Sequence, residues 1–98
     1  MSETRYALNA EQLADALKSL PGWSVEQGKL HKAFKFKDFG AALAFMVASG
    51  IQAEKMNHHP EWFNVYNRVV VDLATHDLDN QISSWDVELA SRMEAIAR

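Results

Sequence analysis

Residues 62–75 read WFNVYNRVVVDLAT, and this stretch decides the fold. Trp62–Tyr66 and Val69–Thr75 are rich in β-branched and aromatic residues, and Asn67 between them is a typical turn residue. The stretch therefore predicts a β-hairpin. Its second strand alternates, and the side chains predicted to face the core are Val69, Val71 and Leu73.

Upstream, the pattern predicts another hairpin, in which Trp23–Glu26 and Lys29–Lys37 flank a Gln-Gly turn. In its second strand Leu30, Phe34 and Phe36 share one face, which we expect to be buried. The lysines that alternate with these aromatics superficially suggest RNA binding. Stacking on bases needs exposed aromatic rings, however, and the strand alternation turns both phenylalanines inward. No nucleic-acid partner is expected.

Three helices are predicted around the hairpins. The first begins at the N-cap Asn9 and stops at Pro21-Gly22, the second runs from Asp38 to about Met56, and the third begins at Ser83. The apolar stripe predicted to pack in the second helix is Phe39, Leu43, Met46, Val47, Gly50 and Ile51. The core positions predicted in the third are Trp85, Leu89, Met93 and Ile96. The order α-β-β-α-β-β-α indicates an α+β fold with helices on one face of an antiparallel sheet.

Length and composition bound the function. The chain has 98 residues, so we expect one domain over residues 1–98 whose active site is shallow or shared with another subunit. A net charge of −3 does not favour nucleic acid or anionic membranes, and the lack of cysteine excludes disulfides and thiolate chemistry. Met1–Asn9 has no apolar run, and the longest uncharged stretch, Phe39–Ala53, is shorter than the roughly 18 residues that span a membrane. We expect a soluble cytoplasmic protein without a membrane partner.

Three of the four histidines, His58, His59 and His76, lie within 19 residues. Histidine titrates near pH 6.5, so it can donate or accept a proton at neutral pH. Pro60 favours an extended His59, and successive side chains of extended backbone diverge, so the adjacent pair should have two different roles. Glu54 precedes His58 by four residues and could fix its tautomer if the helix extends that far. His76 falls on the side of its strand opposite the core.

The residues alone leave alternatives open. The His-His pair could mark only a turn, and the lone His31 is interpreted as merely exposed. Trp62 either anchors the loop or flanks a planar ligand, and we favour the anchor. A zinc site would need His58, His59 and His76 with Glu54 or Asp77, but adjacent histidines rarely converge on one ion. No metal is therefore expected.

Residues 53–67, AEKMNHHPEWFNVYN, closely resemble the signature of the pterin-4a-carbinolamine dehydratases. The family pattern is an acidic residue, three others, His, His or Asn, and Pro, and Glu54, His58, His59 and Pro60 fill it. Thr75, His76 and Asp77 match a second block of Thr-His and an acidic residue. Similar blocks begin the first strand (Leu20, Gly22, Trp23) and precede the long helix (Phe34–Phe39), and the resemblance extends through the final helix. Asn57 stands where some members have Asp.

The resemblance implies a fold of four antiparallel strands with three helices on one side. It also implies an activity, the dehydration of 4a-hydroxytetrahydropterin to quinonoid dihydropterin, which recycles the cofactor of aromatic amino-acid hydroxylases. By resemblance, His58 and His76 are the acid-base pair, while His59 orients the pterin or shares the base role. The residues expected to bind the substrate are Asn57, His58, His59, Ala74, Thr75, His76 and Asp77, with Glu54 behind them.

The family resemblance also implies partners. Members form dimers and often tetramers, so a homodimer or homotetramer is expected, formed through a sheet edge and the helix that carries Gly50. No cofactor is needed, because the pterin is the substrate. Two alternatives remain open: a scaffold role, since some animal relatives bind a homeodomain transcription factor, and a role on another pterin where no hydroxylase exists.

Overall fold

The computed structural model describes residues 6–98, so residues 1–5, which include the start of the predicted Met1–Asn9 segment, lie outside it. The helices are α1 (Ala10–Leu17), α2 (Phe39–Met56) and α3 (Ser84–Ala97), and the strands are β1 (Ser24–Glu26), β2 (Lys29–Lys35), β3 (Glu61–Val65) and β4 (Arg68–Leu73). A short 3-10 helix, η1 (His76–Leu78), follows β4. The predicted α-β-β-α-β-β-α order is confirmed. None of the helices within residues 6–98 is long and apolar enough to cross a membrane.

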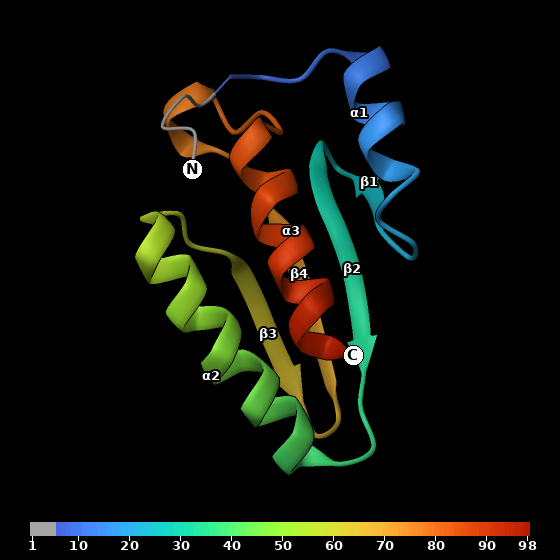
Figure 1. The fold of residues 1–98 in the computed structure, drawn as a ribbon, viewed down its shortest axis with the longest axis vertical. Coiled ribbons are helices and arrows are strands. Elements are labelled where there is room, and N and C mark those ends of the chain that lie inside the picture. Colours follow the sequence, from blue (N-terminus) through green and yellow to red (C-terminus); the bar gives the residue numbers. More distant parts are fainter. Residues whose placement is uncertain (1–5) are drawn as a thin grey trace.

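The four strands form one antiparallel sheet in the order β1-β2-β4-β3. Both predicted hairpins are present, and the long β2–β4 pairing joins them at the centre of the sheet (Figure 1). The Asn67 side chain donates to the Phe36 carbonyl oxygen at 2.9 Å, so the turn of the second hairpin also holds the end of β2. β1 and β3 are therefore the two edges of the sheet.

Some predicted strand ends were wrong. β4 ends at Leu73 instead of Thr75, and β2 ends at Lys35 instead of Lys37. Tyr66, predicted as a strand residue, has a φ of 52° and forms the turn with Asn67. The alternation of side chains cannot locate these ends, because apolar residues continue past the last ladder hydrogen bond.

The core lies between the helices and the inner face of the sheet, as Figure 1 shows for α2 and α3 in front of the strands. β2 and β4 contribute Leu30, Phe34, Val69, Val71 and Leu73, all buried. The helices contribute Ala42, Phe45, Ala53, Met56, Leu89, Ala90 and Met93. The prediction that Val69, Val71 and Leu73 of β4 face the core is thus confirmed. Of the core positions predicted in α3, Leu89 and Met93 are buried, while Trp85 and Ile96 are partly buried against the same cluster.

The predicted packing face of α2 was mostly wrong for the single chain: Met46 packs partly buried against the core, but the four large residues Phe39, Leu43, Val47 and Ile51 face outward. Its outward stripe is 46% exposed at Phe39, 47% at Leu43, 56% at Val47 and 52% at Ile51. The residues that face the sheet and α3 are instead Ala42, Phe45, Ser49, Ala53 and Met56. α2 is apolar on nearly every side, so periodicity could not choose the face. The smaller Ala and Ser side chains let the helix lie close to the sheet.

Candidate active site

The site begins where α2 ends. Asn57 caps the helix in the left-handed conformation, with φ 52° and ψ 46°, and its backbone N–H points to the carbonyl oxygens of Ala53 and Glu54. Asparagine tolerates this conformation better than most residues with a side chain. The turn breaks the helical path, so His58 and His59 leave the helix and enter the loop that leads to β3. The local sequence thus places both imidazoles at one end of the sheet.

His58 is buried and fixed from α3. Its side chain is 6% exposed, and Nε2 lies 2.6 Å from Oδ1 of the fully buried Asp86. An ionised carboxylate only accepts hydrogen bonds, which assigns Nε2 as the donor and leaves Nδ1 as the ring nitrogen able to accept a proton. The arrangement therefore orients the ring and selects its tautomer.

The predicted partner of His58 was wrong. Glu54 does not contact it but lies with Oε1 2.9 Å from Nε2 of His59. The reason is the left-handed turn at Asn57, which takes His58 off the helical face of Glu54. His59 is 59% exposed, so its pair with Glu54 is screened by water. The two adjacent histidines diverge as expected, one buried and one in solvent.

Asp86 is the residue that sequence reasoning missed. Asp86 stands three residues after the N-cap Ser83, the position of a capping-box residue, and the Ser83 backbone N–H does donate to its Oδ2 at 2.8 Å. Oδ2 also accepts from the Thr75 hydroxyl at 2.8 Å. One buried carboxylate thus connects the start of α3, the segment just after β4 and His58. The only sequence signal was an acidic residue at a helix start, where capping is the ordinary explanation.

His76 lies at the same end of the sheet, in the segment that follows β4. β4 ends at Leu73, and His76 opens η1, so strand alternation does not set the direction of its side chain. Because Glu61 pairs with Asp72, the chain after β4 returns to the level of the His58-His59 loop. The His76 side chain is 72% exposed, with Nε2 3.8 Å from Oε2 of Glu61.

The three histidines line one open hollow of about 220 Å³. Its lining residues are Asn57, His58, His59, Ala74, His76 and Asp77. Thr75, also predicted to bind substrate, is not among the lining residues: its side chain is buried and hydrogen-bonds Asp86 and Ser83. The hollow is smaller than typical pockets for drug-sized ligands, which start near roughly 300 Å³. It suits a small ligand that exchanges protons with imidazoles.

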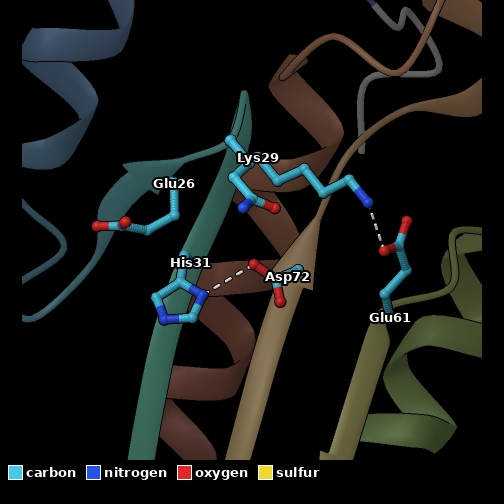
Figure 2. Close-up of a pocket in the computed structure, with 6 residues that line it drawn as sticks. Glu26, Lys29, His31, Glu61 and Asp72 are labelled. Atoms are coloured by element: carbon cyan, nitrogen blue, oxygen red, sulfur yellow. Dashed lines mark hydrogen bonds and ion pairs between the residues drawn. The ribbon is translucent and has the colours of Figure 1, made fainter.

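Two further features concern the grouping of possible metal ligands and the place of His31. Within residues 6–98, no three His, Asp or Glu side chains are grouped so as to hold a metal ion. His31, interpreted as merely exposed, lies on the uncovered face of the sheet with Nδ1 2.8 Å from Oδ1 of Asp72 (Figure 2). That interpretation was wrong, because β4 places a carboxylate directly across the ladder from it.

Comparison with known proteins assigns the family. The family described as Pterin 4 alpha carbinolamine dehydratase matches residues 6–96. The chain belongs to the pterin-4a-carbinolamine dehydratase family. A Solibacter usitatus protein named for this family is 47% identical over 90 residues, which cover 92% of this chain and 94% of that protein. A Brucella ovis protein of the same name is 45% identical over 95% of this chain and 97% of its own length.

A solved structure agrees with this assignment. The crystal structure of a transcriptional coactivator/pterin dehydratase from Brucella melitensis superposes with a TM-score of 0.90 at 44% sequence identity. It covers 95% of this chain and 100% of the other. The resemblance seen in the sequence is confirmed at the level of family and fold.

Proposed function

We propose that this protein is a hydro-lyase that dehydrates 4a-hydroxytetrahydropterin to quinonoid dihydropterin. The observation that carries the proposal is that His58, His59 and His76 all line the same hollow. Family membership supports the dehydratase role. We further propose that the reaction takes place in the cytoplasm, within one domain, and recycles the cofactor of aromatic amino-acid hydroxylases.

The reaction needs two proton transfers. The bond between the 4a carbon and its hydroxyl oxygen breaks, the oxygen takes a proton to leave as water, and a ring nitrogen loses a proton. Histidines can perform both transfers near neutral pH. In our proposal His58 and His76 are the acid-base pair. His58 is held by Asp86, while the more exposed His76 exchanges protons with solvent.

The remaining site residues are proposed to bind the pterin or to hold the histidines in place. His59 orients the pterin, and Asn57, Ala74 and Asp77 line the hollow beside it. Glu54 acts through His59, with which it pairs. Thr75 acts through Asp86 instead of touching the ligand, because its side chain is buried. The proposed mechanism needs no metal or organic cofactor.

The direct test follows the decay of the 4a-carbinolamine by absorbance, with and without the protein. We expect the protein to accelerate the decay, and we expect pretreatment with EDTA to leave the rate unchanged. If the decay were equally fast without protein, the proposed activity would be wrong. Loss of the rate in EDTA and its recovery with a divalent ion would instead contradict the metal-free mechanism.

We also propose that the chain forms a homodimer or homotetramer. The outward stripe of α2, Phe39, Leu43, Val47 and Ile51, is about half exposed. Edge strand β3 and its turn add Phe63, Val65 and Tyr66, which are also more than half exposed. Exposed apolar patches of this kind commonly mark an association surface, and an open strand edge favours pairing with another chain.

A further inference from the structure

The uncovered face of the sheet carries a row of charged side chains beside the proposed active site. In the ladder, Asp72 lies directly opposite His31 on β2 and Glu61 on β3. Two carboxylates facing each other across adjacent strands destabilise a sheet unless each is compensated. Figure 2 shows the compensation: His31 pairs with Asp72 at 2.8 Å, and Lys29 Nζ reaches Glu61 Oε1 at 2.6 Å.

Glu61 is the member of this row that also faces the active site. Its Oε1 accepts from Lys29, while its Oε2 lies 3.8 Å from Nε2 of His76. The backbone of Glu61 is fixed on both sides, since Pro60 precedes it and the ladder pairs it with Asp72. His76, in contrast, sits on a one-turn 3-10 helix with 72% of its side chain exposed. A carboxylate whose backbone is paired in the sheet therefore lies beside an exposed histidine that no strand pairing holds.

We propose that Glu61 is a positioning residue for His76, and that Lys29 orients the Glu61 carboxylate for this task. The inference rests on the proposed role of His76 in the dehydration. Lys29 occupies one carboxylate oxygen and directs the other toward the imidazole. A carboxylate facing Nε2 favours a proton on that nitrogen, which leaves Nδ1 to accept a proton from the reaction.

The exposure of the three side chains limits how much Glu61 can change the rate. Lys29, Glu61 and His76 are 33%, 45% and 72% exposed, so water and salt screen their interactions. Exposed ion pairs contribute up to about 1 kcal/mol, which corresponds to about a five-fold change in rate. We therefore expect Glu61→Gln, which keeps the shape and removes the charge, to lower kcat about two- to five-fold with little change in KM.

Salt separates a charge effect from a structural one. At about 1 M KCl, the Debye length falls to about 3 Å, and the difference in kcat between the wild type and Glu61→Gln should largely vanish. Glu26→Gln is the matched control, because Glu26 and Glu61 line a second hollow, separate from the one lined by the three histidines, and Glu26 accepts from the Ser24 hydroxyl instead of facing His76. It should keep the wild-type kcat. A Glu61→Gln defect that persists undiminished at high salt would contradict the proposal.

The role of Lys29 is tested by a double-mutant cycle. Lys29→Met should lower kcat in the wild-type background and have little further effect in the Glu61→Gln background, because it acts only through Glu61. Equal effects of Lys29→Met in the two backgrounds would overturn the role that we assign to Lys29.

A readout independent of turnover is the imidazole tautomer of His76, measured from its ring ¹⁵N shifts at about pH 8 and assigned by comparison with His76→Gln. We expect the form protonated on Nε2 to predominate in the wild type and to lose population in Glu61→Gln. An unchanged tautomer ratio would overturn the inference. Because this measurement needs no substrate, it stands even if the dehydratase proposal fails. Conversely, an active wild type with an inactive His76→Ala and a fully active Glu61→Gln would reject only the inference.

Discussion

At the scale of single residues, Asp86 combines a structural and a functional task. Its buried carboxylate accepts hydrogen bonds from the Ser83 backbone, the Thr75 hydroxyl and the imidazole of His58. A buried carboxylate is stable only when such donors surround it, so the network that starts α3 also supplies the fixed partner of a histidine. The cap and the site thus share one side chain.

Asp86→Asn tests this sharing. The amide keeps the shape but presents either a second donor or a weaker acceptor to His58, so the ring loses its fixed tautomer. We expect the dehydration rate to fall by at least about ten-fold. We also expect the free energy of unfolding to fall by about 1–3 kcal/mol, because a buried hydrogen-bonding group is left unsatisfied.

Carbinolamine decay and urea denaturation measure the two effects. Asp15→Asn, at an exposed position of α1, is the control and should change neither quantity. A variant Asp86→Asn with full activity would show that the contact between Asp86 and His58 does not serve catalysis.

His76→Ala tests the proposed acid-base pair. Removing a positioned general acid or base costs about 10²- to 10⁴-fold in rate, and we expect a loss in this range. Folding should be little affected, since the side chain is largely exposed. His31→Ala removes a histidine that does not line the hollow of His58, His59 and His76, and it should leave the rate nearly unchanged. Full activity of His76→Ala across pH 6 to 8, with a native circular dichroism spectrum, would exclude His76 from the mechanism.

At the scale of secondary-structure elements, the left-handed cap of α2 places the site. Asn57 ends the helix and turns His58 inward, toward Asp86, while His59 stays outside. One backbone conformation therefore separates two adjacent histidines that a continued helix would have placed only 100° apart around its axis.

Two substitutions at Asn57 test whether its left-handed backbone conformation contributes to stability. Asn57→Ala puts a less tolerant residue at φ 52° and should lower the free energy of unfolding by about 1 kcal/mol. Asn57→Gly accepts the same φ without strain and should keep stability close to wild type. Urea denaturation measures both. If the glycine variant proved the less stable of the two, backbone strain at this cap would not be the deciding factor.

At the scale of the whole molecule, the chain leaves apolar surface uncovered. The helices bury one face of the sheet, but the outward stripe of α2 and the β3 edge remain open. A chain of 98 residues has only a small core in which to bury apolar side chains, and covering this surface with further copies would bury more of them.

Sedimentation velocity tests the association. The wild type should sediment at micromolar concentration as a species larger than the 11.1 kDa chain. A double variant, Leu43→Asp with Val47→Asp, should form a smaller species, because it places two charges on the outward stripe while sparing the core. Ser91→Asp, exposed on α3, is the control and should assemble like the wild type. A wild type that sediments only as a monomer would refute the association.

The sequence by itself determined the order of elements, both hairpins, the helix caps and the family, because these depend on local patterns of turn, cap and alternation. The sequence also identified His58, His59 and His76 as candidate site residues, because each belongs to a short motif of neighbouring residues. Only the tertiary structure decided what those residues contact. The central β2–β4 pairing places Asp72 opposite His31. The left-handed cap at Asn57 turns His58 toward Asp86, whereas the sequence had suggested Glu54 as its partner. The buried face of α2 was also decided by the tertiary structure, because a helix that is apolar on nearly every side can bury any of them, and packing against the sheet and α3 selected one.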